Sequence, residues 1–356
     1  MALAGFESPA LNILLPIGIS FYTFEIVSYL ADLAWHDAPY YPLRRFSLFV
    51  LLFPRLIAGP IVRHHEIVPQ FDLDPRREGL YERLGMGATL LTLGLLKKVF
   101  LADRLAPLAD SAFTGASHAA PTFGEAWTGA LAFTFQLFLD FSAYSEMAIG
   151  IALMLGFTLP QNFNAPYAAL NLRDFWRRWH MTLSRYLRDY VYIPLGGSRA
   201  GPKRYVAAML LTMGLCGLWH GAGWVFVVWG LMHGLGLMIN KAWSERGFAL
   251  PSPLAWSLTF LFVVVGWVIF RSADFATAQA MLASMSGAHG FGGSFAEPLL
   301  IGAAAIVSML GPTTYTSVTR YLRPSPALAA LTATAVLAVL LEVGAGQPQS
   351  FIYFQF

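Results

Sequence analysis

The chain has 356 residues, of which 56% are hydrophobic and only 12% are charged, about half the charged share of a soluble protein. This composition excludes a soluble globular protein, and it equally excludes a disordered chain, which needs low hydrophobicity and high charge. The single cysteine, Cys216, excludes a disulfide scaffold, and the net charge of +3 gives no support to nucleic-acid binding.

A protein of this composition is expected to cross a membrane several times, and each spanning helix needs roughly 20 mostly apolar residues. The segments that fit are, in chain order, 11–31, 45–62, 84–106, 124–140, 142–158, 204–221, 224–241, 254–271, 297–311 and 326–343. Some of them are short or charged, so the sequence predicts an all-α transmembrane bundle of about eight to ten spans, forming one domain over residues 1–356. The N-terminus lacks the basic stretch of a cleavable signal peptide, so the first apolar segments are expected to direct insertion.

The longest polar stretch between these segments is strongly basic. Residues 173–204 hold eight arginines and lysines against two aspartates, which is typical of the cytoplasmic side of a membrane protein. Within it, residues 171–190 place apolar and aromatic side chains on one helix face and basic side chains on another. This pattern predicts an amphipathic helix lying in the plane of the membrane interface.

Ionisable residues inside apolar segments are functional candidates, because a charge within a bilayer is costly. These residues are Glu25, Lys97, Lys98, Asp140, Glu146, His220 and His233. The two lysines are expected to extend toward the interface. The two carboxylates at 140 and 146 flank a predicted turn between two spans, where hydrogen bonding explains them as well as chemistry does. Glu25 has Arg55 or Arg63 as a potential partner.

His220 differs from the others because small residues surround it. Gly217 and Gly230 each have a second glycine four residues later, a spacing that lets helices pack closely and leaves room for a substrate beside the imidazole. A helix running from Arg204 to His220 is about 24 Å long, which places His220 toward the outer face. A histidine titrating near neutral pH is suited to accepting and returning a hydroxyl proton.

Other chemistries receive less support from the sequence. Cys216 lies one helical turn before His220, but a buried cysteine is more often a small apolar side chain than a nucleophile. No H-E-x-x-H spacing and no phosphate-binding glycine loop occur, and the eight histidines are scattered along the chain. The sequence therefore predicts no metal site.

Two long stretches carry a resemblance to a known family. They are NFNAPYAALNLRDFWRRWHMTLSRYLRDYVYIPLGG (162–197) and GLWHGAGWVFVVWGLMHG (217–234), and they resemble the membrane-bound O-acyltransferase family, in its branch that acetylates alginate. Residues 15–32, 53–71 and 140–157 and the terminal FIYFQF are similar to the same branch. The resemblance extends from about residue 11 to residue 356.

The resemblance implies a helical bundle with a central acyl-transfer tunnel, in which His220 is the essential histidine. It makes His180 the second family histidine and a candidate catalytic residue, with a structural role or a place along the donor path as the alternatives. It implies transfer of an acyl group, in this branch acetyl, from a cytoplasmic thioester such as acetyl-CoA across the bacterial inner membrane, with no bound cofactor. Periplasmic acetyltransferase proteins then complete transfer to an exported polysaccharide. His220 is expected to act as the general base. The residues expected to contact the donor's phosphates, or anionic lipid head groups instead, are Arg173, Arg177, Arg178 and Arg188.

Three alternatives stay open at this point. The first is a transporter or channel in which His220 and His233 relay protons. The second is a member of the same family with another acceptor, such as teichoic acid receiving D-alanine, or a lipid. The third is a non-catalytic remnant, because relatives in this branch usually begin with two or three additional apolar helices before the 15–32 stretch. The chain is accordingly expected to have a misplaced start, to be a fragment or to be a shortened homologue.

Overall fold

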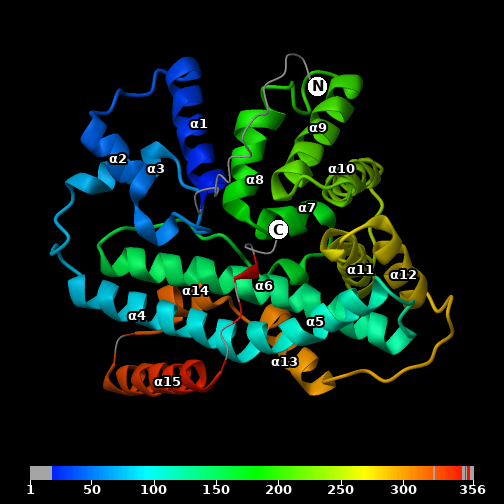
Figure 1. Ribbon diagram of the computed structural model, residues 1–356. Coiled ribbons are helices and arrows are strands. Elements are labelled where there is room, and N and C mark those ends of the chain that lie inside the picture. Colours follow the sequence, from blue (N-terminus) through cyan, green and yellow to red (C-terminus); the bar gives the residue numbers. More distant parts are fainter. Residues whose placement is uncertain (1–17, 324, 347–348, 350, 353–356) are drawn as a thin grey trace, which may run out of the picture.

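The computed structural model describes residues 18–323, 325–346, 349 and 351–352, and within these ranges the chain forms helices and no strand. Two long helical stretches cross the middle of the molecule side by side (Figure 1). One is α6 (Phe123–Met154), and the other is α4 (Leu80–Lys97), continued by the π-helical η3 (Lys98–Ala102) and by α5 (Asp103–Ala116). The predicted all-α class is confirmed.

The remaining helices pack around this central pair (Figure 1). The helices drawn above α6 or beside it are α1 (Ile19–Trp35), α2 (Leu43–Leu51), α3 (His64–Ile67), α7 (Leu172–Arg178), α8 (Met181–Leu187), α9 (Pro202–His220), α10 (Trp224–Glu245), α11 (Ser252–Arg271) and α12 (Phe275–Met285). Those on the side of α4 and α5 are α13 (Pro298–Met309), α14 (Thr314–Thr316) and α15 (Pro326–Ala345). The central helix α6 is largely buried along its length, which makes it the core of the bundle.

Five helices in the described part of the chain are long and apolar enough to cross a membrane. They are Leu80–Ala116, Phe123–Met154, Trp224–Glu245, Ser252–Arg271 and Pro326–Ala345. The pair Pro298–Met309 and Thr314–Tyr321, bent by 56°, gives a sixth if it counts as one broken span. By this measure the described residues contain fewer spans than the eight to ten predicted, and the first predicted span begins outside them. The segments 124–140 and 142–158 form one helix, and 45–62 contains only the nine-residue α2 and a 3-10 turn.

The turn predicted between Asp140 and Glu146 does not exist, because both carboxylates lie inside α6. Each has a cation opposite it. Lys97 Nζ lies 2.6 Å from Glu146 Oε2, and Lys98 Nζ lies 3.0 Å from Asp140 Oδ1. The expectation that these lysines extend toward the interface was therefore wrong. Ion pairing across the helix–helix contact lets α6 continue through two acidic residues without a break.

The amphipathic segment 171–190 is two helices, so the prediction of one continuous helix was wrong. α7 ends at Arg178, and α8 begins at Met181 and runs into the π-helical η5 (Arg188–Tyr192). His180 lies between them with a left-handed φ of 40°. The first amide of α8 donates to the Asn162 carbonyl at 2.9 Å, so a partner outside the helix stabilises the break. That the segment lies in the membrane interface stays a prediction.

Glycines bring α9 and α10 into backbone contact, as their spacing predicts. A Cβ added at Gly217 would lie 2.1 Å from the carbonyl oxygen of Phe226, and one added at Gly230 would lie 2.1 Å from that of Met213. Both distances are far inside van der Waals contact. At Gly214, by contrast, an added Cβ would make only an ordinary contact, 3.5 Å from a Leu231 methyl group. The glycines at 217 and 230 therefore set the separation of the two helices.

Alanine at Gly217 or Gly230 is expected to lower the stability of the protein by about 1–3 kcal/mol, because the two helices must separate to admit the methyl group. Gly214→Ala is the matched control, and its higher helix propensity should leave stability unchanged or slightly raised. Thermal unfolding in detergent, followed by tryptophan fluorescence, measures the difference. Equal melting temperatures for all three variants would contradict the close contact.

The expected partnership of Glu25 is confirmed with Arg55. The two side chains form an ion pair, and each is almost completely buried. The Arg55 guanidinium also donates to the carbonyl oxygen of Phe49. This pair connects α1 to the 3-10 turn η1 (Phe53–Arg55).

Glu25→Gln should destabilise the protein by about 3–5 kcal/mol, because it leaves the Arg55 cation buried without a countercharge. The double variant Glu25→Leu/Arg55→Met removes both charges and should recover most of the loss. Thermal unfolding of the wild type, the single variant and the double variant provides the comparison. A single variant as stable as the wild type would show that the pair contributes nothing.

Candidate active site

His180 is held in one tautomer by its neighbours. Its Nδ1 lies 3.0 Å from Oδ1 of Asn162, and its side chain is buried. The same Asn162 oxygen accepts the backbone N–H of Thr182 at 3.3 Å, while the Asn162 amide nitrogen donates to Ser145 Oγ at 3.1 Å. An atom that accepts from a backbone N–H is an oxygen, so the His180 Nδ1 opposite it carries the proton. Nε2 is therefore left with a lone pair.

That lone pair faces the interior of the bundle. Nε2 of His180 is buried and has no hydrogen-bond partner among the residues that the structure describes. The Phe141 ring stands at 89° to the imidazole, with 4.7 Å between the ring centroids. Burial, reinforced by the nearby His220, lowers the pKa of His180 well below its usual value. His180 is therefore a neutral hydrogen-bond acceptor at physiological pH.

His220 ends α9 inside an aromatic enclosure. Its ring centroid lies 4.7 Å from that of Trp219, 5.4 Å from that of Trp229 and 5.2 Å from that of Phe270. These rings come from α9, α10 and α11, so three helices shape its surroundings. The Trp219 ring also lies 6.4 Å from the His180 ring. Two histidines that are 40 positions apart in the sequence thus meet at one tryptophan.

His233 and Cys216 lie buried among side chains of the core, which suits a structural role. The indole N–H of Trp176 donates to His233 Nδ1 at 3.2 Å, which connects α7 to α10, and the His233 side chain is fully buried. Its ring packs against Trp229 at 4.9 Å. Cys216 is also fully buried, within the hydrophobic core. Both residues support the walls of the enclosure around His220.

The four candidate arginines fall into two groups. Arg173, Arg177 and Arg178 belong to α7, whereas Arg188 begins η5. Arg178 Nε pairs with Asp174 at 2.8 Å, and the exposed Arg173 and Arg177 make no ion pair with any residue that the structure describes. These two are the more available for an external anion.

Arg188 is already engaged by a neighbouring carboxylate. Its Nε lies 2.6 Å from Asp189, which also forms an ion pair with Arg63. Burial raises the pKa of Asp189, but hydrogen bonds from Arg188 and Arg63 outweigh burial and leave that pKa below its usual value. Asp189 is therefore ionised at neutral pH and competes with any external anion for Arg188.

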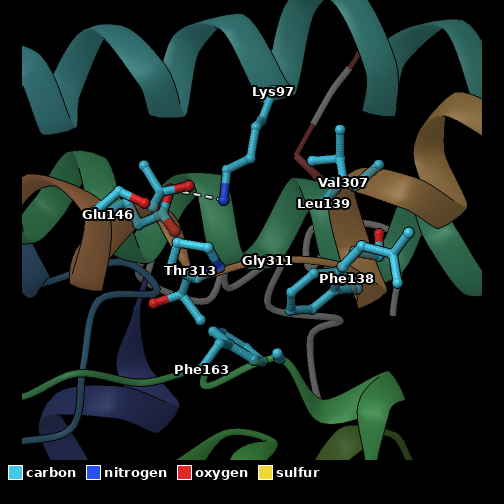
Figure 2. A pocket seen from close by; sticks show the side chains of 14 residues that line it. Lys97, Phe138, Leu139, Glu146, Phe163, Val307, Gly311 and Thr313 are labelled. Carbon is cyan, nitrogen blue, oxygen red and sulfur yellow. Dashed lines mark ion pairs between the residues drawn. The ribbon is translucent and has the colours of Figure 1, made fainter. Parts of the chain in front are cut away.

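A cavity of about 220 Å³ lies between α4, α6 and the bend after α13 (Figure 2). In the figure, Lys97 extends from α4 toward Glu146, and Phe138 and Phe163 lie on the side away from Lys97. The hydroxyl groups that line it belong to Ser308, Thr313, Thr314 and Ser317. Phe163 also faces His180, with 6.2 Å between the ring centroids. One aromatic side chain thus contacts both this polar cavity and the candidate site.

Sequence reasoning identified neither Asn162 nor Trp219 as a site residue. Asn162 lies 18 residues before His180, a separation with no helical register, so only the fold shows that it fixes the imidazole. Trp219 precedes His220 directly and belongs to the same GLWHGAG stretch. Its role as the contact between the two histidines depends on α8 and α9 meeting at that depth.

Comparison with known proteins places this chain in a family. The profile of MBOAT, the membrane-bound O-acyltransferase family, matches residues 11–273. A probable alginate O-acetylase AlgI of Azotobacter vinelandii is 49% identical over 278 residues, which cover 77% of this chain and 54% of that protein. A peptidoglycan O-acetyltransferase of Helicobacter pylori is 40% identical over 309 residues, covering 79% of this chain and 58% of that protein.

A more distant relative has a third acceptor in its name. A teichoic acid D-alanyltransferase of Streptococcus thermophilus is 32% identical over 243 residues, covering 65% of this chain and 58% of that protein. The chain spans little more than half the length of these curated relatives. The family match covers well over half of the chain and includes His180, His220 and the helices around them, and this multi-pass membrane protein therefore belongs to the membrane-bound O-acyltransferase family.

Proposed function

We propose that the chain is an O-acyltransferase that moves an acyl group from a cytoplasmic thioester to a hydroxyl on the outer side of the bacterial inner membrane. The observation that carries the proposal is the meeting of His180 and His220 at Trp219, inside a wall of aromatic rings. The family match supports acyl transfer as the reaction class. Relatives named alginate O-acetylase and peptidoglycan O-acetyltransferase support acetyl as the acyl group and an exported polysaccharide as the acceptor.

In the proposed mechanism, His220 is the general base. It takes the proton of the acceptor hydroxyl as the oxygen attacks the thioester carbonyl, and the new C–O bond replaces the C–S bond. The proton returns from His220 to the departing thiolate, so the site ends neutral. Because donor and acceptor reach His220 from opposite sides, the acyl group crosses the membrane while the thiol stays in the cytoplasm.

His180 has a different role, set by its tautomer. With the Nδ1 proton directed at Asn162, Nε2 accepts a hydrogen bond and has no proton to give to an oxyanion. We assign it to holding an N–H or O–H group of a substrate near His220. It is a binding group in this scheme rather than a second base, with its Nδ1 proton engaged by Asn162.

The donor is proposed to be acetyl-CoA or another acyl thioester, with no resident cofactor. The exposed Arg173 and Arg177 are the proposed contacts for its phosphates, with Arg178 and Arg188 available after exchange of their carboxylate partners. Periplasmic acetyltransferase proteins are the proposed partners that complete transfer to the polymer. Teichoic acid and lipid acceptors are the alternatives within the family.

His220→Ala should abolish transfer, with a loss of about 10²–10⁴-fold in rate, because it removes the general base. The measurement is O-acetylation of the exported polysaccharide in a deletion strain, together with thioester consumption by the membranes. His118→Ala changes an exposed histidine outside the candidate site. It is the matched control and should retain activity.

Membrane insertion of each variant is checked by fractionation. Full transfer by inserted His220→Ala would exclude this residue as the base. A transporter would leave the thioester unconsumed in every variant, so the same assay separates transport from group transfer.

Asn162→Ala should lower the rate to nearly the level of His180→Ala, because the imidazole loses the contact that fixes its tautomer. The double variant Asn162→Ala/His180→Ala should be no slower than either single variant, since both substitutions remove the same function, the oriented imidazole of His180. Initial rates over a range of donor concentrations provide the test. Additive losses in the double variant would mean that Asn162 and His180 act independently.

A further inference from the structure

A cluster of metal-ligand side chains lies apart from the two family histidines. Asp32 lies near the end of α1, and His64 and His65 begin α3. One potential ligand atom from each of the three lies within 4.8 Å of the others. Asp32 and His64 are buried, and His65 is exposed to solvent. His64 Nε2 lies 3.1 Å from Asp32 Oδ2.

Two tyrosine hydroxyl groups contact the buried members of this cluster, His64 and Asp32. The Tyr41 hydroxyl lies 3.0 Å from His64 Nδ1, and the Tyr190 hydroxyl donates to Asp32 Oδ2 at 2.8 Å. Histidine and carboxylate ligands of metals are characteristically fixed by such outer contacts. A tyrosine hydroxyl both donates and accepts, so Tyr41 satisfies His64 Nδ1 whichever ring nitrogen carries the proton. His64 Nε2 can therefore exchange its proton for a metal ion without loss of that contact.

We propose that Asp32, His64 and His65 bind a divalent transition-metal ion of the zinc class. Two imidazole nitrogens and one carboxylate form a three-ligand set that leaves a fourth position for water. Imidazole ligands favour zinc and its neighbours over magnesium or calcium, which prefer oxygen alone. Two tetrahedral ligand atoms on zinc lie about 3.4 Å apart, close to the separation of His64 Nε2 from Asp32 Oδ2. The exposed His65 ring lies 5.3 Å from the His64 ring, measured between centroids, and its ligand atom lies within 4.8 Å of those of Asp32 and His64.

The ion would connect parts of the bundle that are distant in sequence. Asp32 belongs to α1 and the two histidines belong to α3. Tyr190 belongs to η5, which follows α8, and α8 begins next to His180. Metal binding would therefore fix the N-terminal helices against that segment. This site is independent of the proposed acyl transfer, because none of its ligands contacts His180 or His220. This proposal departs from the sequence prediction of no metal site, since Asp32 and His64 are 32 positions apart and form no local ligand spacing.

Zinc binding by the detergent-purified full chain, produced without a polyhistidine tag, tests the proposal. The protein is stripped with a chelator and titrated with Zn²⁺ alone, and bound metal is counted by elemental analysis. One zinc per chain is expected for the wild type and for the His118→Ala control. Asp32→Asn and His65→Ala should each weaken binding at least tenfold, and Tyr41→Phe, which removes an outer contact, by about tenfold.

A second measurement, the melting temperature with and without zinc, distinguishes loss of the metal site from poor folding of a variant. Zinc should raise the melting temperature of the wild type and leave that of Asp32→Asn and His65→Ala unchanged, because only a native-state site stabilises the fold. His65 is exposed, so its alanine variant should fold normally without metal. Absence of zinc from the wild type, or equal binding by the wild type and both ligand variants, would overturn the proposal and leave the cluster a hydrogen-bonded link between helices.

Discussion

Charge pairing between the continuous α4–η3 stretch and α6 is the interaction on which the rest of the structure depends. Both helices are long enough to cross a membrane, and each carries buried ionisable groups that no bilayer would accept alone. Pairing Lys97 with Glu146 and Lys98 with Asp140 removes that penalty and fixes the two helices in one register. The second oxygen of Asp140 also accepts the backbone N–H of Ile352 at 2.7 Å, so the described C-terminal residues are held to the same helix. The helices around the histidines then have a fixed surface on which to pack.

The candidate site is built outward from that surface by polar contacts of the chain with itself. Ser145 of α6 holds Asn162, and Asn162 holds the imidazole of His180 and the first amide of α8. One asparagine thus breaks the amphipathic segment and orients a site residue in the same place. The left-handed backbone at His180 lies where the chain turns between α7 and α8, next to Trp219 near the end of α9. Local strain at this position and the candidate site have a common origin.

Local patterns in the sequence were sufficient to predict some features of this protein. Apolar length and low charge predict helices in a membrane, glycines four apart predict the contact at Gly217, and the quoted motifs predict the family and single out His220. Features that depend on a distant partner were missed. The continuity of α6 depends on lysines some 45 residues earlier, and the break at His180 depends on Asn162. Hydropathy alone scores a paired and an unpaired charge alike, so it cannot tell a turn from an uninterrupted helix.

The glycine contacts between α9 and α10 have a consequence for the position of His220. The backbones of α9 and α10 touch at Gly217 and Gly230, which leaves no room for one helix to slide past the other. The two helices therefore behave as one rigid body, with His220 at the end of α9. Aromatic rings from two neighbouring helices pack against this end of the pair. On one side these belong to α11, and on the other to α1, whose Phe24 stacks on Trp219 at 5.2 Å. The position of His220 against those rings therefore depends on two residues that lack a side chain.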